Sequence, residues 1–95
     1  MEYQFPKIVT DNTINQQIWK MREEMLEVEA EHAELILAQI KGEPVDYTNL
    51  TIEIFDLWQS LETYLQKLPL SKYEIDMLHR SVIRKNRARG YYEEG

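Results

Sequence analysis

Two pairs of acidic residues in this 95-residue chain have the spacing of metal ligands: Glu24-x-x-Glu27 and Glu53-x-x-Asp56. Residues three apart are neighbours on one face of a helix, so each pair can converge on a single cation. Carboxylate oxygens suit Mg²⁺, which keeps several waters that the oxygens of a phosphate substrate can displace. Four carboxylates in one patch would need such a cation, because like charges at short range disfavour ionisation. The pairs therefore predict a Mg²⁺ site, with Mn²⁺ as an alternative ion.

The elements that would carry these pairs are helices, because apolar residues recur three and four positions apart along the chain. Good N-cap residues, a capping box and well-placed glycine and proline residues mark three helical segments. The expected boundaries are residues 10–13 to Gly42, Thr48 to just before Pro69, and Ser71 to about Gly90.

The two acidic pairs occupy matching positions on the first two helices. With Met25 and Ile54 as the centres of the apolar stripes, both pairs lie at offsets of roughly −100° and −160°. A short connection favours antiparallel packing, in which the four carboxylates would meet at the border of the apolar core. The alternative is a solvated acidic face, since acidic pairs are frequent on exposed helices.

The predicted fold is all-α: an antiparallel bundle of three main helices in a single domain, residues 1–95, with short arms at 1–10 and 91–95. Three helices with wide apolar faces make an incomplete bundle, because large residues such as Trp19 and Phe55 lie off the main stripes. We expect a homodimer or homotetramer to complete the core. The alternative is that a short fourth helix or the arms cover the excess apolar surface.

Composition excludes several classes of function. The chain has no cysteine, which excludes disulfides, thiolate metal sites and cysteine nucleophiles. It shows no signal peptide and no apolar run near the length of a membrane span, so we expect a cytoplasmic protein with no membrane partner. The net charge of −6 argues against nucleic acid as a partner.

The third helix ends in a basic cluster, because residues 80–89 hold five basic residues and no acid. Lys85 and Arg89 continue the apolar stripe of Leu78, so we expect both to point toward the bundle. With Asn86 beside them, they suit the oxygens of a polyphosphate. The alternative is that the two cations pair directly with the carboxylates of the acidic pairs.

The chain resembles the MazG-like all-α nucleotide pyrophosphohydrolases in two stretches. The first matches the EExxE … ExxD motif of that family with Glu23, Glu24, Glu27, Glu53 and Asp56. The second, residues 85–92, resembles the KN-x-x-RGYY ending of short phage and bacterial members. The resemblance covers roughly residues 14–92, nearly the whole chain.

The resemblance implies hydrolysis of a (deoxy)nucleoside triphosphate to a monophosphate and pyrophosphate, by dimers or tetramers. Its implied Mg²⁺ ligands are Glu24, Glu27, Glu53 and Asp56. Its implied catalytic residues are Glu23 and Glu24, with Glu23 orienting or activating water. Its implied nucleotide-binding residues are Lys85, Asn86, Arg89 and Tyr92.

The chain also departs from the family pattern. Val28 stands where leucine is commoner, and Phe55 stands where glycine is common. A bulky Phe55 would alter how closely the two helices approach. No separate base-recognition motif is present, and Trp19, Trp58 and Tyr64 are candidates either for stacking on a base or for the core.

Two other functions remain open at this point. One is a ferritin-like di-metal protein, since Glu29-x-x-His32 and Asp76-x-x-His79 each pair a carboxylate with a histidine. The other is a non-enzymatic oligomeric helical interaction module, in which the acidic residues are solvated surface, because short degenerate motifs also occur by chance.

Overall fold

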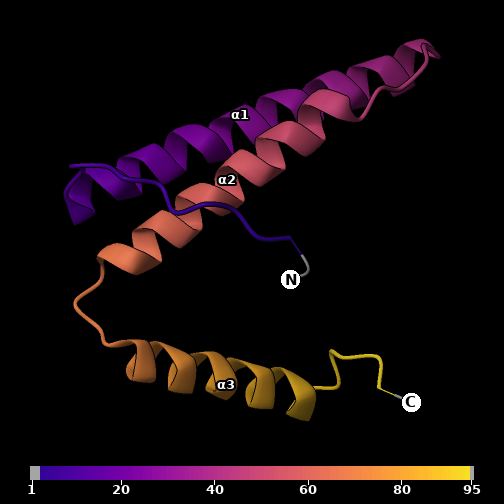
Figure 1. Cartoon of the computed structure of the whole chain (residues 1–95). Coiled ribbons are helices and arrows are strands. Elements are labelled where there is room, and N and C mark those ends of the chain that lie inside the picture. The colour runs from indigo at the N-terminus through magenta and orange to yellow at the C-terminus, as the bar shows by residue number, and fades with distance from the viewer. Residues whose placement is uncertain (1–2, 95) are drawn as a thin grey trace.

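The computed structural model describes residues 3–94, which form three helices: α1 (Ile14–Lys41), α2 (Thr48–Lys67) and α3 (Lys72–Ala88). These residues contain no strand, which confirms the predicted all-α class. α1 and α2 lie side by side and run in opposite directions, joined at one end by residues 42–47 (Figure 1). No described helix has the length and apolar character to cross a bilayer. The predicted arms extend to residues 1–2 and 95, which lie outside the described residues.

Local hydrogen bonds fix the helix ends at the predicted places. Thr13 Oγ1 accepts from the Gln16 backbone N–H at 3.1 Å, while the Gln16 side chain accepts from the Thr13 backbone at 2.9 Å. Ser71 and Glu74 form the same reciprocal box at the start of α3. Gly42 ends α1 with φ of 69°, in the left-handed region that residues with a Cβ atom rarely adopt.

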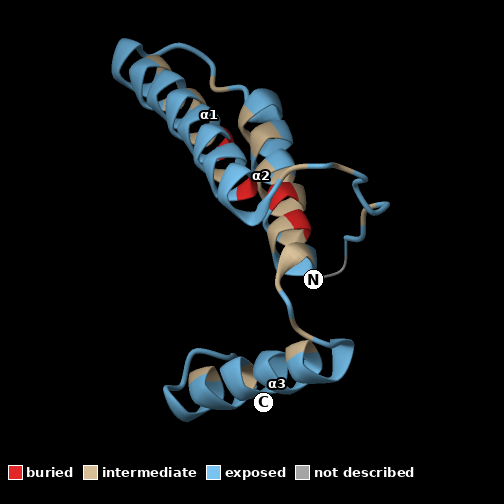
Figure 2. Cartoon of the chain, turned by 90° about the vertical axis from the view of Figure 1, so that its left-hand side faces the viewer, coloured by how far each residue is buried: buried red, intermediate tan, exposed pale blue. Residues whose placement is uncertain are grey.

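The seam between α1 and α2 is polar. Its buried residues are Gln17, Glu24, Ser60 and Thr63, and no hydrophobic side chain is buried anywhere in residues 3–94 (Figure 2). Met25 and Ile54 are 43% and 45% exposed. The centres of the two apolar stripes are therefore not buried within the single chain, whose fully buried residues are all polar.

α3 stands apart from the hairpin of α1 and α2. Within the described part of the chain, α1 and α2 are the only helices that contact each other. Both views show α3 beyond the end of α2, across the turn that contains Pro69 (Figures 1 and 2). The radius of gyration is 16.9 Å, against about 13 Å for a compact chain of this length. The single chain is therefore a helical hairpin with a separate third helix, and the predicted three-helix bundle does not form within it.

The N-terminal arm is fastened across α2. Gln59 Nε2 donates to the Pro6 carbonyl at 3.2 Å, and Lys67 Nζ donates to the Thr10 carbonyl at 3.0 Å. These contacts connect residues more than fifty positions apart in the sequence. The arm therefore belongs to the folded hairpin and lies close to the buried polar seam.

An aromatic cluster joins the same arm to the outer side of α2. The rings of Tyr3 and Phe5 meet Phe55 edge-on, with centroids 5.3 and 5.6 Å away. Trp58 stacks on Phe55 at 5.8 Å. Phe55 thus packs against the arm and Trp58.

Candidate functional site

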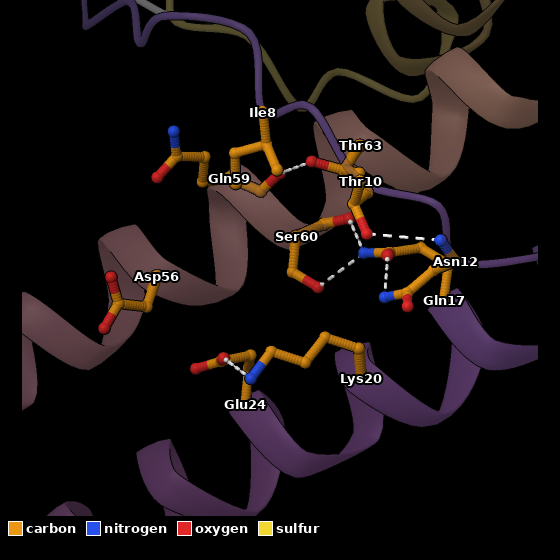
Figure 3. Close-up of a pocket in the computed structure, with 10 residues that line it drawn as sticks. All are labelled: Ile8, Thr10, Asn12, Gln17, Lys20, Glu24, Asp56, Gln59, Ser60 and Thr63. Carbon is orange, nitrogen blue, oxygen red and sulfur yellow. Dashed lines mark hydrogen bonds and ion pairs between the residues drawn. The ribbon is translucent and has the colours of Figure 1, made fainter.

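Three carboxylates from α1 and α2 meet in the seam. One oxygen each of Glu24, Glu27 and Glu53 lies within 4.8 Å of the other two. The antiparallel hairpin produces this group, because it sets the one-turn spacing of Glu24 and Glu27 opposite Glu53. The structure thus brings together three of the four predicted ligands. Asp56 lies outside the group and lines an adjoining pocket together with Glu24 (Figure 3).

One carboxylate oxygen of Glu53 has no hydrogen-bond partner in this group. Its Oε2 atom is shielded from solvent and has no partner among the described residues. A hydrogen bond with the Glu27 carboxyl raises the pKa of Glu53 to about 7, and partial burial and the charges of Glu27, Asp56 and Glu24 act in the same direction. That bond requires a proton on one carboxyl, so the ionised group has only acceptors. A hard cation would replace the shared proton, which is the chemistry these residues fit.

Lys20 joins the site from one turn earlier on α1. Its Nζ atom lies 3.0 Å from Glu24 Oε1 and 3.8 Å from Glu23 Oε2. The hydrogen bond to Glu24, followed by the charge of that residue, raises the pKa of Lys20. Lys20 was not among the predicted site residues, although its four-residue spacing from Glu24 is the usual one for an ion pair on a helix.

Glu23 and Glu24 have opposite surroundings. The Glu24 side chain is 11% exposed and faces the seam, whereas that of Glu23 is 68% exposed. Glu23 therefore lies on the solvent side of α1 and does not join the carboxylate group among the described residues. Its predicted catalytic role depends on the family motif alone.

A polar pocket of about 310 Å³ adjoins the carboxylates (Figure 3). α1, α2 and the N-terminal arm all contribute to its lining. On one side, Gln17 Nε2 donates to the carbonyl and hydroxyl oxygens of Ser60 at 3.2 and 3.1 Å, and Gln17 Oε1 accepts from Asn12 at 3.3 Å. Lys20, Glu24 and Asp56 are among its lining residues, so a ligand within it would lie next to the carboxylate group. The sequence gives little signal for this pocket, because uncharged polar residues on a helix usually face solvent.

The predicted phosphate-binding residues lie at the C-terminal end of α3 and directly after it, away from the carboxylates. Lys85 and Arg89 are exposed, and α3 contacts neither α1 nor α2 in the described chain. The expectation that both cations point toward the bundle is therefore wrong for the single chain. They form no ion pair with a described carboxylate, and Arg89 lies 6.0 Å from the ring of Tyr91. Tyr92, at the end of this segment, lies 5.8 Å from the guanidinium of Arg87.

The carboxylate–histidine pairs of the ferritin-like alternative do not meet. Glu29 and His32 are exposed on α1, while Asp76 and His79 are exposed on α3. Because α1 and α3 make no contact, residues 3–94 do not gather these four ligands. This observation removes the geometric support for a di-iron site within one chain.

A broad apolar face covers the outer side of the hairpin. We define it by the apolar residues that line two neighbouring hollows of about 660 and 390 Å³, whose linings also include Arg22 and Glu62: Ile18, Trp19, Met21, Met25, Ile54, Leu57, Trp58, Leu61 and Leu65. The hollows share Leu57 and Leu61, so they form one continuous surface. Trp19 is 61% exposed on this face, with Arg22 5.8 Å from its ring. A contiguous apolar surface thus remains uncovered on the single chain.

No protein-family model, curated protein or solved structure matches the chain.

Proposed function

We propose that the chain is a MazG-like, Mg²⁺-dependent nucleoside triphosphate pyrophosphohydrolase that cleaves a (d)NTP to the monophosphate and pyrophosphate. The observation that carries the proposal is the convergence of Glu24, Glu27 and Glu53 to within 4.8 Å. The buried, donor-free Oε2 of Glu53 supports it, because a hard divalent cation would supply the missing partner. The order and spacing of the acidic motif and the basic ending favour a polyphosphate substrate.

In this proposal Glu24, Glu27 and Glu53 hold the cation. Bound there, Mg²⁺ supplies polarisation of phosphate oxygens and a lowered pKa of the attacking water. Asp56 lies beside the same pocket as an exposed carboxylate, in position to bind a water or a second ion that arrives with the nucleotide. Lys20 stays protonated and can turn from Glu24 to a phosphate oxygen when the cation takes its place.

The working protein in this proposal is a homodimer or homotetramer in the cytoplasm, where its nucleotide substrate is found. The apolar face supports assembly, since residues 3–94 bury no hydrophobic side chain by themselves. Apolar burial is the main favourable contribution to folding, so a second copy that covers this face would supply what the single chain lacks.

Pyrophosphate release from a panel of NTPs and dNTPs, with and without Mg²⁺, tests the proposed activity. We expect Mg²⁺-dependent turnover of at least one nucleotide. A Glu53→Gln variant should lose this turnover while keeping its helical circular dichroism. The matched control is Glu34→Gln, which removes an exposed carboxylate of α1 outside the group and should retain activity. Full activity in Glu53→Gln would refute the metal assignment.

The second candidate is the non-enzymatic oligomeric interaction module. The extent of the exposed apolar face favours it, and the ion pair of Lys20 with Glu24 partly neutralises the carboxylates without any metal. Under this alternative the chain assembles but turns over no nucleotide, and neither Mg²⁺ nor Mn²⁺ changes its melting temperature. A metal-dependent rise in melting temperature that is lost in Glu53→Gln would contradict this alternative.

A further inference from the structure

The polar pocket of about 310 Å³ continues along the seam from the carboxylate group toward the start of α1 (Figure 3). Its lining on α1 extends from Glu24 back to Gln17, which is about 10 Å along the helix. Ser60 of α2 lies opposite Gln17, as the hydrogen bonds between them show. A nucleotide whose phosphates meet a cation at Glu24, as the proposed function requires, therefore has its nucleoside part within reach of this end of the pocket.

The N-terminal arm forms a wall at the same end. Thr10 and Asn12 line the pocket there, and both precede residue 14, where the resemblance to the nucleotide pyrophosphohydrolases begins. The Asn12 backbone N–H donates to Thr10 Oγ1 at 3.2 Å, and Lys67 Nζ of α2 donates to the Thr10 carbonyl at 3.0 Å. These bonds fix the arm beside the pocket. The two family-like stretches do not supply this wall.

The buried amide of Gln17 sets the orientation of the Asn12 side chain. Gln17 is 2% exposed, and its Nε2 atom donates to the Ser60 carbonyl, which can only accept a hydrogen bond. This bond leaves Gln17 Oε1 to accept from Asn12 Nδ2 at 3.3 Å. Asn12 Oδ1 and the second Nδ2 proton have no partner among residues 3–94. The pocket thus contains an oriented amide with a free acceptor and a free donor.

The chemistry of this end of the pocket suits a nucleobase. Its polar lining residues carry no charge: Thr10, Asn12, Gln17, Ser60 and Thr63. A few fixed, uncharged polar groups are what orient a small organic ligand in a pocket. Asn and Gln amides recognise base edges by pairing a donor and an acceptor with them. The free donor and acceptor of Asn12 match this type of contact.

The aromatic cluster of Tyr3, Phe5, Phe55 and Trp58 holds the arm in place. Tyr3 and Phe5 meet Phe55 edge-on at 5.3 and 5.6 Å, and Phe5 also meets Trp58 at 6.2 Å. Aromatic pairs in this geometry are attractive beyond the area that they bury. Phe55 stands where glycine is common in the family pattern, and glycine has no side chain for the arm to contact. The anchor of the arm is therefore particular to this chain.

We propose that the N-terminal arm determines the base specificity of the enzyme: Asn12, oriented by Gln17 and Ser60, contacts the base of the bound nucleotide, and the aromatic cluster holds the arm in position for this contact. The inference depends on the proposed function for the placement of the phosphates. The base contact itself can be tested without turnover.

Nucleoside binding followed by NMR tests the contact directly. The probes are the common ribonucleosides and deoxyribonucleosides, which lack phosphate, and ribose is the base-free control. At least one nucleoside should shift the side-chain amide resonances of Asn12 and Gln17, and ribose should leave them unchanged. No shift with any nucleoside, or equal shifts with ribose, would overturn the proposal.

A matched pair of variants defines the specific contact. Asn12→Ala should weaken binding of that nucleoside about tenfold, because it removes a hydrogen-bonding group that faces the base. Asn15→Ala removes an exposed amide outside the pocket and should bind as the wild type does. Equal binding by the two variants would contradict the role of Asn12.

Selectivity in the nucleotide panel tests the same contact during turnover. In Asn12→Ala, kcat/KM for the preferred base should fall about tenfold relative to the other bases. Phe55→Ala should reduce selectivity in the same direction by releasing the arm, with unchanged helical circular dichroism. An equal loss for every base would show that the arm acts only on the fold, and a wild type without base preference would equally contradict the inference.

The two readouts separate the inference from the proposed function. Mg²⁺-dependent turnover without nucleoside binding at Asn12 would refute the role of the arm and leave the hydrolase intact. Nucleoside binding at Asn12 without turnover of any nucleotide would refute the hydrolase, and the base contact would stand.

Discussion

Lowering the pH from about 8 to about 6 should weaken divalent-cation binding about tenfold. The reason is Glu53, whose pKa is raised to about 7, first by its hydrogen bond with Glu27 and then by partial burial and nearby negative charge. A cation binds the ionised carboxylate and must displace the proton. Roughly nine-tenths of Glu53 is ionised at the higher pH and about one-tenth at the lower, so the apparent Kd rises by their ratio.

The same carboxyl affects folding in the opposite direction. Because the folded-state pKa lies above the ordinary value of 4.5, the stabilising contribution of Glu53 is fully present below that value and is lost as the pH rises through about 7. In the metal-free protein, this carboxyl should therefore lower the melting temperature at pH values above about 7. Added Mn²⁺ or Mg²⁺ should raise the melting temperature most in that range, where the site is ionised and without a counter-charge.

Isothermal titration calorimetry with Mn²⁺ at several pH values measures the predicted change directly. Wild-type protein and Glu34→Gln should both show the tenfold weakening, with release of up to one proton per ion at the lower pH. Glu53→Gln should bind more weakly throughout and lose most of the pH dependence. A wild-type Kd that changes less than about twofold over this range would refute the assigned role of the Glu53 proton.

Three further changes test other parts of the structure. Gln17→Leu should lower the free energy of unfolding, measured in urea melts, by about 1–3 kcal/mol, because it removes two hydrogen bonds to Ser60 and leaves the buried Ser60 hydroxyl without that partner. An unchanged urea midpoint would contradict the stabilising role of these hydrogen bonds. Leu61→Asp places a charge on the apolar face, so it should lower the mass measured by light scattering toward that of the 11.4 kDa monomer or unfold the chain. The exposed control Gln66→Asp should leave both the mass and the fold unchanged. Gly42→Ala should cost about 1–2 kcal/mol through its positive φ alone, since an added Cβ meets no atom within 4 Å; a neutral effect in thermal melts would contradict that conformation.

Helix boundaries were the most predictable part of the fold. Thr13, Gly42, Ser71 and Glu74 act through bonds within a few residues of the chain, so their effect can be derived from the local sequence. The convergence of Glu24 and Glu27 with the second helix followed from helical spacing and a short connection. These interactions require no knowledge of what lies on the far side of each helix.

The direction of the apolar stripes could not be derived in this way. Periodicity centres on Met25 and Ile54, but it does not say whether a stripe packs within the chain or against another one. The structure places Gln17 and Glu24 in the seam instead, where hydrogen bonds and an ion pair compensate their burial. The separation of α3 was missed for the same reason, because the periodicity of the Leu78 stripe does not identify the surface that covers it.

Product analysis of a purified nucleotide reaction tests the central claim most directly. Wild-type protein should convert a (d)NTP with Mg²⁺ to monophosphate and pyrophosphate in equal amounts, and omission of the metal should abolish both products. Release of inorganic phosphate and a nucleoside diphosphate, or no product with any of the nucleotides, would contradict the claim that the Glu24–Glu27–Glu53 group serves pyrophosphohydrolysis.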